Sequence, residues 1–160
     1  LRVTKVDLSA LTEETVHTLQ IAAEQKGQTL TADIAPGITL EGDSGKLMQI
    51  FYNLTDNAIK YTPENGHIAV RLAQSGANVL FAVTDDGIGI PEEDQKHIFE
   101  RFYRVDKARS RATGGTGLGL SIVRQLAAMH GGTVSVSSQP GQGATFTVTL
   151  PMDAKRGEKA

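Results

Sequence analysis

The sequence contains no cysteine, so it can form neither a disulfide framework nor a thiolate metal site, and packing alone must hold its helices in place. It also lacks an excess of either charge, because 16 Lys and Arg residues against 18 Asp and Glu residues leave a formal net charge of -2. Such a chain has no basic field to attract a nucleic acid backbone or an anionic membrane surface. We therefore expect no nucleic acid partner and no direct membrane contact, and an anionic ligand must be met by local positive charges.

Long hydrophobic runs are lacking as well. No stretch approaches the roughly 20 apolar residues that span a bilayer, and no charged-then-apolar signal segment opens the chain. The sequence begins with Leu1 rather than methionine, which is typical of a segment of a longer protein. With 160 residues, of which 39% are hydrophobic, the chain is long enough for one domain with a real core. We expect that domain at residues 1–151 and a charged, disordered tail at 152–160.

Hydrophobic periodicity divides the chain into helices and strands. After an extended lead through Leu8, the predicted helices lie at 11–25, from Asp43 or Ser44 to the stop at Pro63, and at 119–129. The predicted strands lie at 29–34, 133–137 and 144–150, with a hairpin from 68–72 to 79–83. This order predicts an α/β (α+β) two-layer sandwich, in which three helices cover one face of a mixed, mostly antiparallel sheet of about five strands.

The second predicted helix has two distinct faces. Its apolar stripe contains Leu47, Ile50, Phe51, Leu54 and Ala58, and a polar flank about 120° away contains Gln49, Asn53, Asp56, Asn57 and Lys60. Asparagine is a mediocre helix former, so a merely solvated face would more naturally use Glu and Lys. Asparagine carbonyls are good neutral ligands for Mg²⁺, and Lys60 can meet a phosphate one turn further on. An exposed face that happens to contain asparagine fits the helix alone equally well.

The segment from Asp85 to Ile90 follows an apolar strand that ends at Val83. A buried carboxylate at a strand end can accept a hydrogen bond from the exocyclic amine of adenine, whereas guanine presents a carbonyl oxygen at that position. Asp85 is therefore a candidate adenine reader, and glycines at 87 and 89 would let the backbone approach the base or the sugar. The alternative interpretation is a tight turn with a solvated aspartate.

Two further segments have the composition of ligand-binding loops. Residues 115–121 are glycine-rich and precede the third helix, so their amides and the helix N-terminus can receive phosphate oxygens, although neither the P-loop nor the dinucleotide fingerprint is present. Residues 101–116 carry five Lys and Arg side chains with few apolar ones, which is typical of a mobile lid and equally of a basic solvated loop. Residues 141–146 predict a turn before the last strand, with Phe146 in the core.

Together these segments resemble the sequence boxes of sensor histidine kinases. The N box corresponds to residues 49–62, the G1 box to 85–90, the F box to 98–104, the G2 box to 115–123 and the final glycine box to 141–146. The resemblance covers about residues 5–150. It implies the Bergerat ATP-binding fold of the GHKL superfamily, ATP and Mg²⁺ as cofactors, and transfer of the γ-phosphoryl group to a histidine.

The resemblance also implies roles for individual residues. Asn57 and Asn53 would serve Mg²⁺, Lys60 and Arg104 the phosphates, Tyr61 the adenine ring and Asp85 its amine, with Asn53, Lys60 and Arg104 as the catalytic set. The remaining pocket residues would be Gly87, Gly89, Ile90, Gly115, Thr116, Gly117, Leu118, Gly119, Leu120 and Thr145. ATPases of the wider superfamily have a water-activating glutamate at the position of Asn53. An amide cannot act as a general base, so this site is suited to holding ATP rather than hydrolysing it.

The phosphoacceptor histidine of this family is usually followed by an acidic residue. His17, His67, His97 and His130 are followed by Thr, Ile, Ile and Gly, so we interpret all four as structural or surface residues, with His130 at a helix end. The acceptor would then lie on a separate dimerisation domain of the same parent, with a response regulator downstream. The domain itself would be monomeric and cytoplasmic, and its parent anchored in the inner membrane.

Two rival functions belong to other classes. One is a serine-directed kinase of the same superfamily, against which the F box argues. The other is a binding module in which ATP only switches a protein interface, and this alternative stays open.

Overall fold

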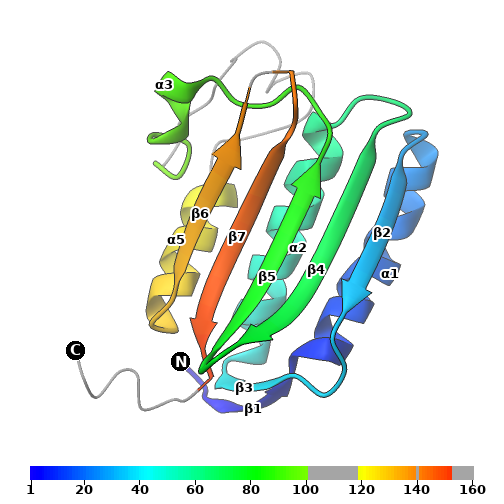
Figure 1. The fold of residues 1–160 in the computed structure, drawn as a ribbon. Coiled ribbons are helices and arrows are strands. Elements are labelled where there is room, and N and C mark those ends of the chain that lie inside the picture. The colour runs from blue at the N-terminus through cyan, green and yellow to red at the C-terminus, as the bar shows by residue number, and fades with distance from the viewer. Residues whose placement is uncertain (101–118, 140, 153–160) are drawn as a thin grey trace.

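The computed structural model of the protein describes residues 1–100, 119–139 and 141–152, and its described part forms two layers (Figure 1). One layer is a five-stranded sheet in the order β2-β4-β5-β7-β6. Its strands are β2 (Thr29–Ile34), β4 (His67–Ser75), β5 (Asn78–Asp85), β7 (Ala144–Pro151) and β6 (Thr133–Ser138). Only β2 and β4 pair in parallel, and the other neighbours are antiparallel. The predicted mixed, mostly antiparallel sheet is therefore confirmed.

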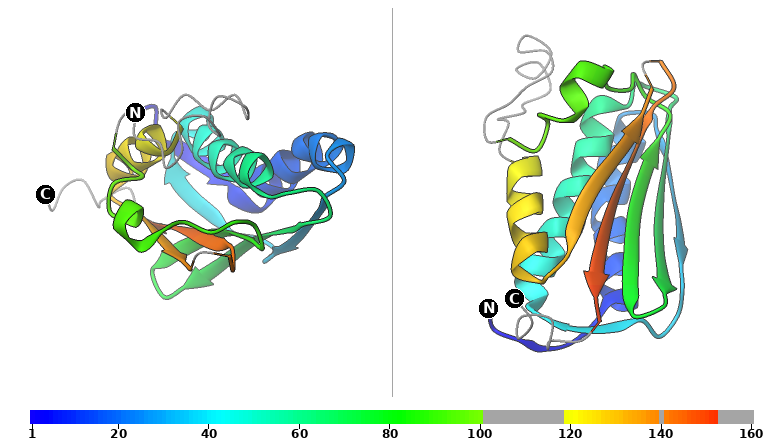
Figure 2. Two further views of the ribbon diagram at one scale, coloured as in Figure 1. Left: turned by 90° about the horizontal axis from the view of Figure 1, so that it is seen from above. Right: turned by 60° about the vertical axis from the view of Figure 1, so that its left-hand side comes forward.

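The second layer consists of α1 (Leu8–Gln25), α2 (Ser44–Tyr61) and α5 (Gly119–Met129), the three long helices of the described residues. All three lie on the same face of the sheet (Figure 2). The apolar stripe of α2 is buried between α2 and the sheet, and Phe51 stacks on Phe81 of β5 with ring centroids 3.9 Å apart. Asp43 begins α2 by accepting a hydrogen bond from the N–H of Lys46 at 3.1 Å, and Pro63 follows its last turn. The predicted arrangement of helices is confirmed.

Helix α1 begins at Leu8, three residues earlier than predicted. Asp7 caps it by accepting a hydrogen bond from the N–H of Ala10 at 3.0 Å. The periodicity was obscured because the first turns bury Thr12 and Thr15, whose hydroxyls donate to the carbonyls of Leu8 and Leu11 at 2.7 and 2.9 Å. A threonine whose hydroxyl bonds within its own helix can occupy an apolar position.

A small antiparallel sheet joins β1 (Thr4–Asp7) to β3 (Thr39–Gly42). The sequence did not predict β3, because four residues that include a glycine show too little alternation to be distinguished from a turn. This pair lies at the end of the molecule where α2 begins (Figure 1). Among the described residues, no helix is both long enough and apolar enough to cross a membrane.

The opposite end of the molecule gathers the segments that matter for a ligand. There α2 ends, β5 ends, and β4, β7 and α5 begin (Figure 1). The sheet register places Asp85 opposite both Ile68 and Ala144. The short helix α3 (Glu92–Gln95) follows the loop that leaves β5 at this end. A ligand site is therefore expected at this end of the sheet.

Candidate functional site

The polar flank of α2 runs toward this end of the molecule. Asn53, Asp56, Asn57 and Lys60 are half-buried, whereas Gln49, nearer the start of the helix, is exposed. Lys60 forms an ion pair with Asp56 one turn earlier, with 3.2 Å between Nζ and Oδ2. Partial burial of two amides beside one ion pair is unusual for a merely solvated helix face. The flank therefore has the exposure of a surface that a ligand can reach and partly cover.

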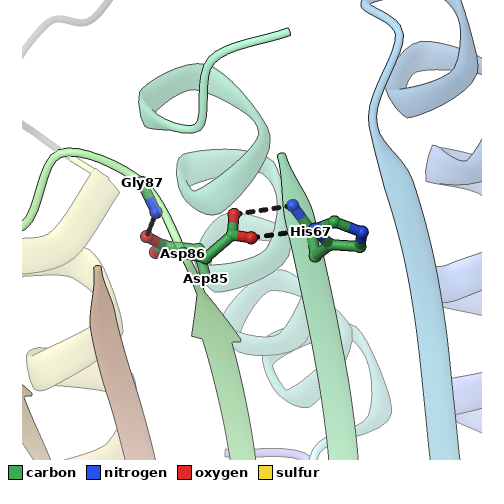
Figure 3. A network of polar contacts seen from close by, with 4 residues as sticks. All are labelled: His67, Asp85, Asp86 and Gly87. Carbon is green, nitrogen blue, oxygen red and sulfur yellow. Dashed lines mark hydrogen bonds and ion pairs between the residues drawn. The ribbon is translucent and has the colours of Figure 1, made fainter. Parts of the chain in front are cut away.

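Asp85, the last residue of β5, has a side chain that is almost entirely buried, with 8% of the residue exposed. Its Oδ1 accepts a hydrogen bond from the N–H of Gly87 at 2.9 Å (Figure 3). Burial raises the pKa of this carboxyl, and hydrogen bonds from the backbone of Gly87 and Ala144 oppose that rise. Among the described residues no cationic side chain pairs with this carboxylate. A buried carboxylate without such a partner is a strong acceptor for a neutral N–H donor, so this environment suits the predicted adenine reader.

Gly87 brings the loop after β5 against the end of α2. A Cβ atom at this position would lie 2.7 Å from the carbonyl oxygen of Tyr61 and 3.2 Å from the Cα of Thr62. A side chain would therefore push the loop away from the helix. Two residues later, Gly89 has a φ of 73°, a conformation that other residues rarely adopt. The structure thus brings the backbone carbonyl of Tyr61 against Gly87, the glycine two residues after Asp85.

The neighbouring Asp86 points in another direction and has another function. Its carboxylate accepts hydrogen bonds from the backbone N–H of His67 at 2.7 Å and from the ring Nδ1 of His67 at 2.8 Å (Figure 3). These bonds, with the backbone bond largest, lower the pKa of Asp86. Asp86 therefore ties the start of β4 to the loop, which leaves Asp85 as the carboxylate that faces the site.

Two residues that the sequence analysis missed hold the end of α2 in place. The Lys26 ammonium donates to the carbonyls of Ile59 and Lys60 at 2.7 and 2.9 Å. The buried Gln28 side chain donates to the carbonyl of Ile59 at 2.9 Å and to that of Thr62. The last carbonyls of a helix lack partners within the helix, and a cation there also complements the helix dipole. Nothing distinguished these residues in the sequence, where Lys26 and Gln28 flank Gly27 as ordinary turn residues do.

Several predicted residues are not brought into this cluster. Thr145 lies on the opposite face of the sheet, where its hydroxyl is 3.0 Å from that of Thr84, so its side chain is separated from Asp85 by the sheet. Gly119 and Leu120 begin α5, as predicted, and among the described residues no atom of another segment lies within 4 Å of a Cβ built at Gly119. The remaining predictions fall on residues outside the described part of the chain: Arg104, Gly115, Thr116, Gly117, Leu118, the lid and residues 153–160 of the tail. Met152, the first residue of the predicted tail, is described: its N–H donates to the carbonyl of Ala77 at 3.0 Å, and its carbonyl accepts from the N–H of Glu41 at 3.3 Å.

Comparison with known proteins identifies the architecture around this cluster. Residues 42–154 match the family model described as histidine kinase-, DNA gyrase B-, and HSP90-like ATPase, and this match spans every element that builds the cluster except the turn at Lys26–Gln28. The chain belongs to this ATPase family. The predicted resemblance, and the Bergerat fold that it implied, are thereby confirmed.

The similar proteins of this ATPase family are sensor kinases. The sensor-like histidine kinase SenX3 of Mycolicibacterium smegmatis is 47% identical over 146 residues, which cover 91% of this chain and 38% of SenX3. The chain therefore spans less than two-fifths of the length of that relative. The solved catalytic domain of histidine kinase ThkA superimposes with a TM-score of 0.84 at 28% identity, covering 98% of this chain and 99% of that one.

Two larger solved structures contain the same fold. Full-length ShkA, in complex with AMPPNP, has a TM-score of 0.81 at 35% identity, covering 94% of this chain and 31% of ShkA. ThkA in complex with the response regulator protein TrrA has a TM-score of 0.80 at 25% identity, covering 96% of this chain and 42% of ThkA. This ATPase fold therefore occurs as one part of a longer kinase.

The donor atoms in the cluster fit magnesium better than a transition metal. Within the described residues there is no group of three or more His, Asp or Glu side chains that can hold a metal ion. Asn53 and Asn57 lie four residues apart on one helix face, and both residues are half-buried. Mg²⁺ typically takes one or two protein oxygens and completes its shell with phosphate and water. In this ATPase family member, the two amides suit a cation that arrives with a nucleotide.

Proposed function

We propose that this chain binds Mg-ATP at the end of the sheet and transfers the γ-phosphoryl group to a histidine on a separate dimerisation domain. The observation that carries the proposal is the juxtaposition of the buried Asp85 with the end of α2, through the contact of Gly87 with Tyr61. This contact places Asp85, which would recognise the base, beside the polar flank of α2, which would bind the metal ion and the phosphates. Membership of the ATPase family supports ATP as the ligand, and the similarity to sensor histidine kinases supports a histidine as the phosphoryl acceptor.

Asp85 would recognise adenine through its exocyclic amine. The carboxylate accepts a hydrogen bond from Gly87 with one oxygen and is shielded from water, so a correctly placed N–H donor would be bound strongly and a carbonyl oxygen repelled. Gly87, Gly89 and Ile90 would line the base on the loop side, and Tyr61 would lie against the ring.

Asn53 and Asn57 would hold the metal ion, and Lys60 would contact the phosphates. Magnesium, when bound, supplies neutralisation of the phosphate charge. Lys60 would leave Asp56, its present partner at 3.2 Å, because a half-buried ion pair that water still reaches contributes little free energy and a triphosphate carries more charge. Arg104, Gly115, Thr116, Gly117 and Leu118, together with Gly119 and Leu120 at the start of α5, complete the proposed phosphate contacts.

Transfer would follow an in-line displacement. The lone pair of a histidine ring nitrogen forms a bond to the γ-phosphorus as the bond from that phosphorus to the oxygen of the leaving ADP breaks. The side chains of this chain would contribute positioning and charge neutralisation. Asn53 offers no base to activate water, which favours transfer over hydrolysis.

The proposal extends to the rest of the protein. A parent kinase would carry the dimerisation domain and pass the phosphoryl group to a response regulator, by analogy with the ThkA complex with TrrA. We propose a monomeric cytoplasmic domain at residues 1–151, a tail at 152–160, and a parent anchored in the inner membrane.

Phosphotransfer gives a direct test. The chain is mixed with the histidine-bearing dimerisation domain of its parent and γ-labelled ATP with Mg²⁺, and we expect acid-labile, base-stable label on that domain. Label that is only acid-stable would indicate a serine-directed kinase. ATP binding without any label would indicate a nucleotide-switched binding module, and no binding at all would refute the proposed function.

A further inference from the structure

The loop between β5 and α3 is held at Ile90 through both polar groups of its backbone. The N–H of Ile90 donates to Oγ of Ser138 at 2.8 Å, and its carbonyl accepts from Nε2 of Gln95 at 2.9 Å. Ser138 is the last residue of β6 and lies 48 positions away in the chain. Peptide groups of a surface loop are commonly bonded to water. Here Ser138 of β6 binds the N–H of Ile90, and Gln95 of α3 binds its carbonyl.

The two side chains are also joined to each other. The second N–H of the Gln95 amide donates to the carbonyl of Ser138 at 2.9 Å, so this amide bridges two carbonyls. The hydroxyl of Ser138 donates to the carbonyl of Gly143 at 2.6 Å while it accepts from Ile90. Gln95 and Ser138 are both half-buried, which limits competition from water. We call this set of four hydrogen bonds the Gln95–Ser138 clamp.

The clamp belongs to a larger contact between the loop and the β6–β7 turn. The N–H of Gly141 donates to the carbonyl of Ile88 at 2.8 Å. At Gly143 a Cβ atom would overlap the carbonyl oxygen of Asp85, so the turn lies directly on the backbone of the proposed base reader. The segment from Asp85 to Ile90 is therefore held at Asp85, Ile88 and Ile90, with the flexible Gly89 between the last two.

Holding this segment has a consequence for a ligand. A loop that contains two glycines samples many conformations unless tertiary bonds restrict it, and a ligand that must order such a loop binds more weakly. If Ile90 were released, the backbone at Gly89 would be less restricted, and Gly87 would lose a support of its contact with the end of α2. The clamp removes that disorder when the chain folds, before a nucleotide arrives.

We propose that Gln95 and Ser138 are positioning residues for nucleotide binding, which act by fixing the backbone of Ile90 and so the loop that carries Asp85 and Gly87. Neither side chain needs to touch the nucleotide. The inference rests on the proposed function, since it concerns the same site.

The test uses three variants of the whole chain and one control. Gln95→Met keeps the length of the side chain and removes both N–H donors. Ser138→Ala removes the hydroxyl, whereas Ser138→Thr retains a hydroxyl at this position. Gln74→Met is the matched control, because Gln74 donates a single bond to the carbonyl of Gly76 at the far end of β4. Affinity for Mg-ATP and Mg-ADP is measured by calorimetry, and hydrogen exchange of the Ile90 and Gly141 amides is measured without nucleotide.

We expect Gln95→Met and Ser138→Ala to lower the affinity for both nucleotides by about tenfold, which is the effect of losing one or two hydrogen bonds. Exchange should accelerate at Ile90 and Gly141 while β4 and β5 stay protected, and Ser138→Thr and Gln74→Met should resemble the wild type. Wild-type affinity in Gln95→Met would overturn the inference. So would exchange that rises equally throughout the sheet, because it would show a general structural role. A wild-type chain that binds no nucleotide would instead refute the proposed function.

Discussion

The Nε2 atom of His130 accepts a hydrogen bond from the backbone N–H of Asp43 at 3.1 Å, 87 residues earlier in the chain. On the other side of the ring, Nδ1 donates to the carbonyl of Leu126 at 2.8 Å. A carbonyl can only accept and an amide N–H can only donate, so these two bonds require the neutral ring with its proton on Nδ1. The fully buried imidazole thereby connects the end of α5 to the residue that caps α2.

His130→Ala should destabilise the domain by about 3 kcal/mol, because it opens a cavity and leaves the partly buried amide of Asp43 without its partner. The free energy of unfolding is measured by urea titration. His17→Ala, on an exposed part of α1, should change it by less than about 0.5 kcal/mol. Equal effects of the two substitutions would contradict this account of His130.

Alanine substitutions at Gly141 and Gly143 distinguish the cost of a positive φ from the cost of a steric overlap with Asp85. Both glycines have a φ of 81°, but within the described part of the chain a Cβ meets nothing within 4 Å at Gly141 and overlaps the carbonyl of Asp85 at Gly143. Gly141→Ala should therefore cost about 1 kcal/mol from its backbone conformation alone. Gly143→Ala should cost clearly more and should also weaken ATP binding, because the turn must move away from Asp85. Thermal unfolding and calorimetry check both expectations, and similar losses in the two variants would refute the close contact.

Asp85→Asn should lower the affinity for ATP by on the order of 2 kcal/mol or more, because the N–H of Gly87 would hold the amide oxygen and the NH2 group would then face the adenine amine. Calorimetry with Mg-ATP measures the loss. An unchanged affinity would remove Asp85 from the site.

The same substitution should alter the pH dependence of stability. The pKa of Asp85 is raised in the folded state, above an unfolded value of about 3.9. The unfolded chain then loses this proton first, so the stability that the protonated carboxyl provides is complete below about pH 3.9 and is lost as the pH rises through the folded pKa. Asp85→Asn should remove this decline, which urea titrations of the nucleotide-free domain at pH 4 to 7 would detect as a flatter profile. Parallel profiles for the two proteins would contradict the raised pKa.

Asn57→Ala should weaken the binding of Mg-ATP more than the binding of ATP in the presence of a chelator. A ligand of the cation contributes only when the cation is present. Gln49→Ala, which lies on the same flank of α2 but is exposed, provides the control and should affect neither condition. Equal losses with and without magnesium would argue against metal ligation by Asn57.

The sequence was sufficient to predict the parts of the fold that have a regular pattern. The two faces of α2, the alternation of β4 and β5 and the glycines after Asp85 are all local features, and each led to the correct element. Four residues of β3 were too few to show alternation. Buried threonines hid the start of α1, because their apolar environment depends on hydrogen bonds that the sequence does not display.

The supports of the site were missed for a related reason. Lys26 and Gln28 bond to residues more than 30 positions away, and Gln95 to Ser138 at a separation of 43. In sequence these are ordinary polar residues near turns, and only the tertiary fold shows which carbonyls they meet. Thr145 presents the opposite case, since its motif suggested the pocket while strand alternation put its side chain on the other face.

That other face of the sheet has a practical use. Short side chains such as Ser135 on β6 point away from the helices there, and Ser135 is exposed. Since the chain has no thiol of its own, a single cysteine placed at this position would accept one spectroscopic label. The label would lie outside the core and on the opposite side of the sheet from Asp85 and α2, so it would report on tumbling, and on docking of a partner, without occupying the nucleotide site.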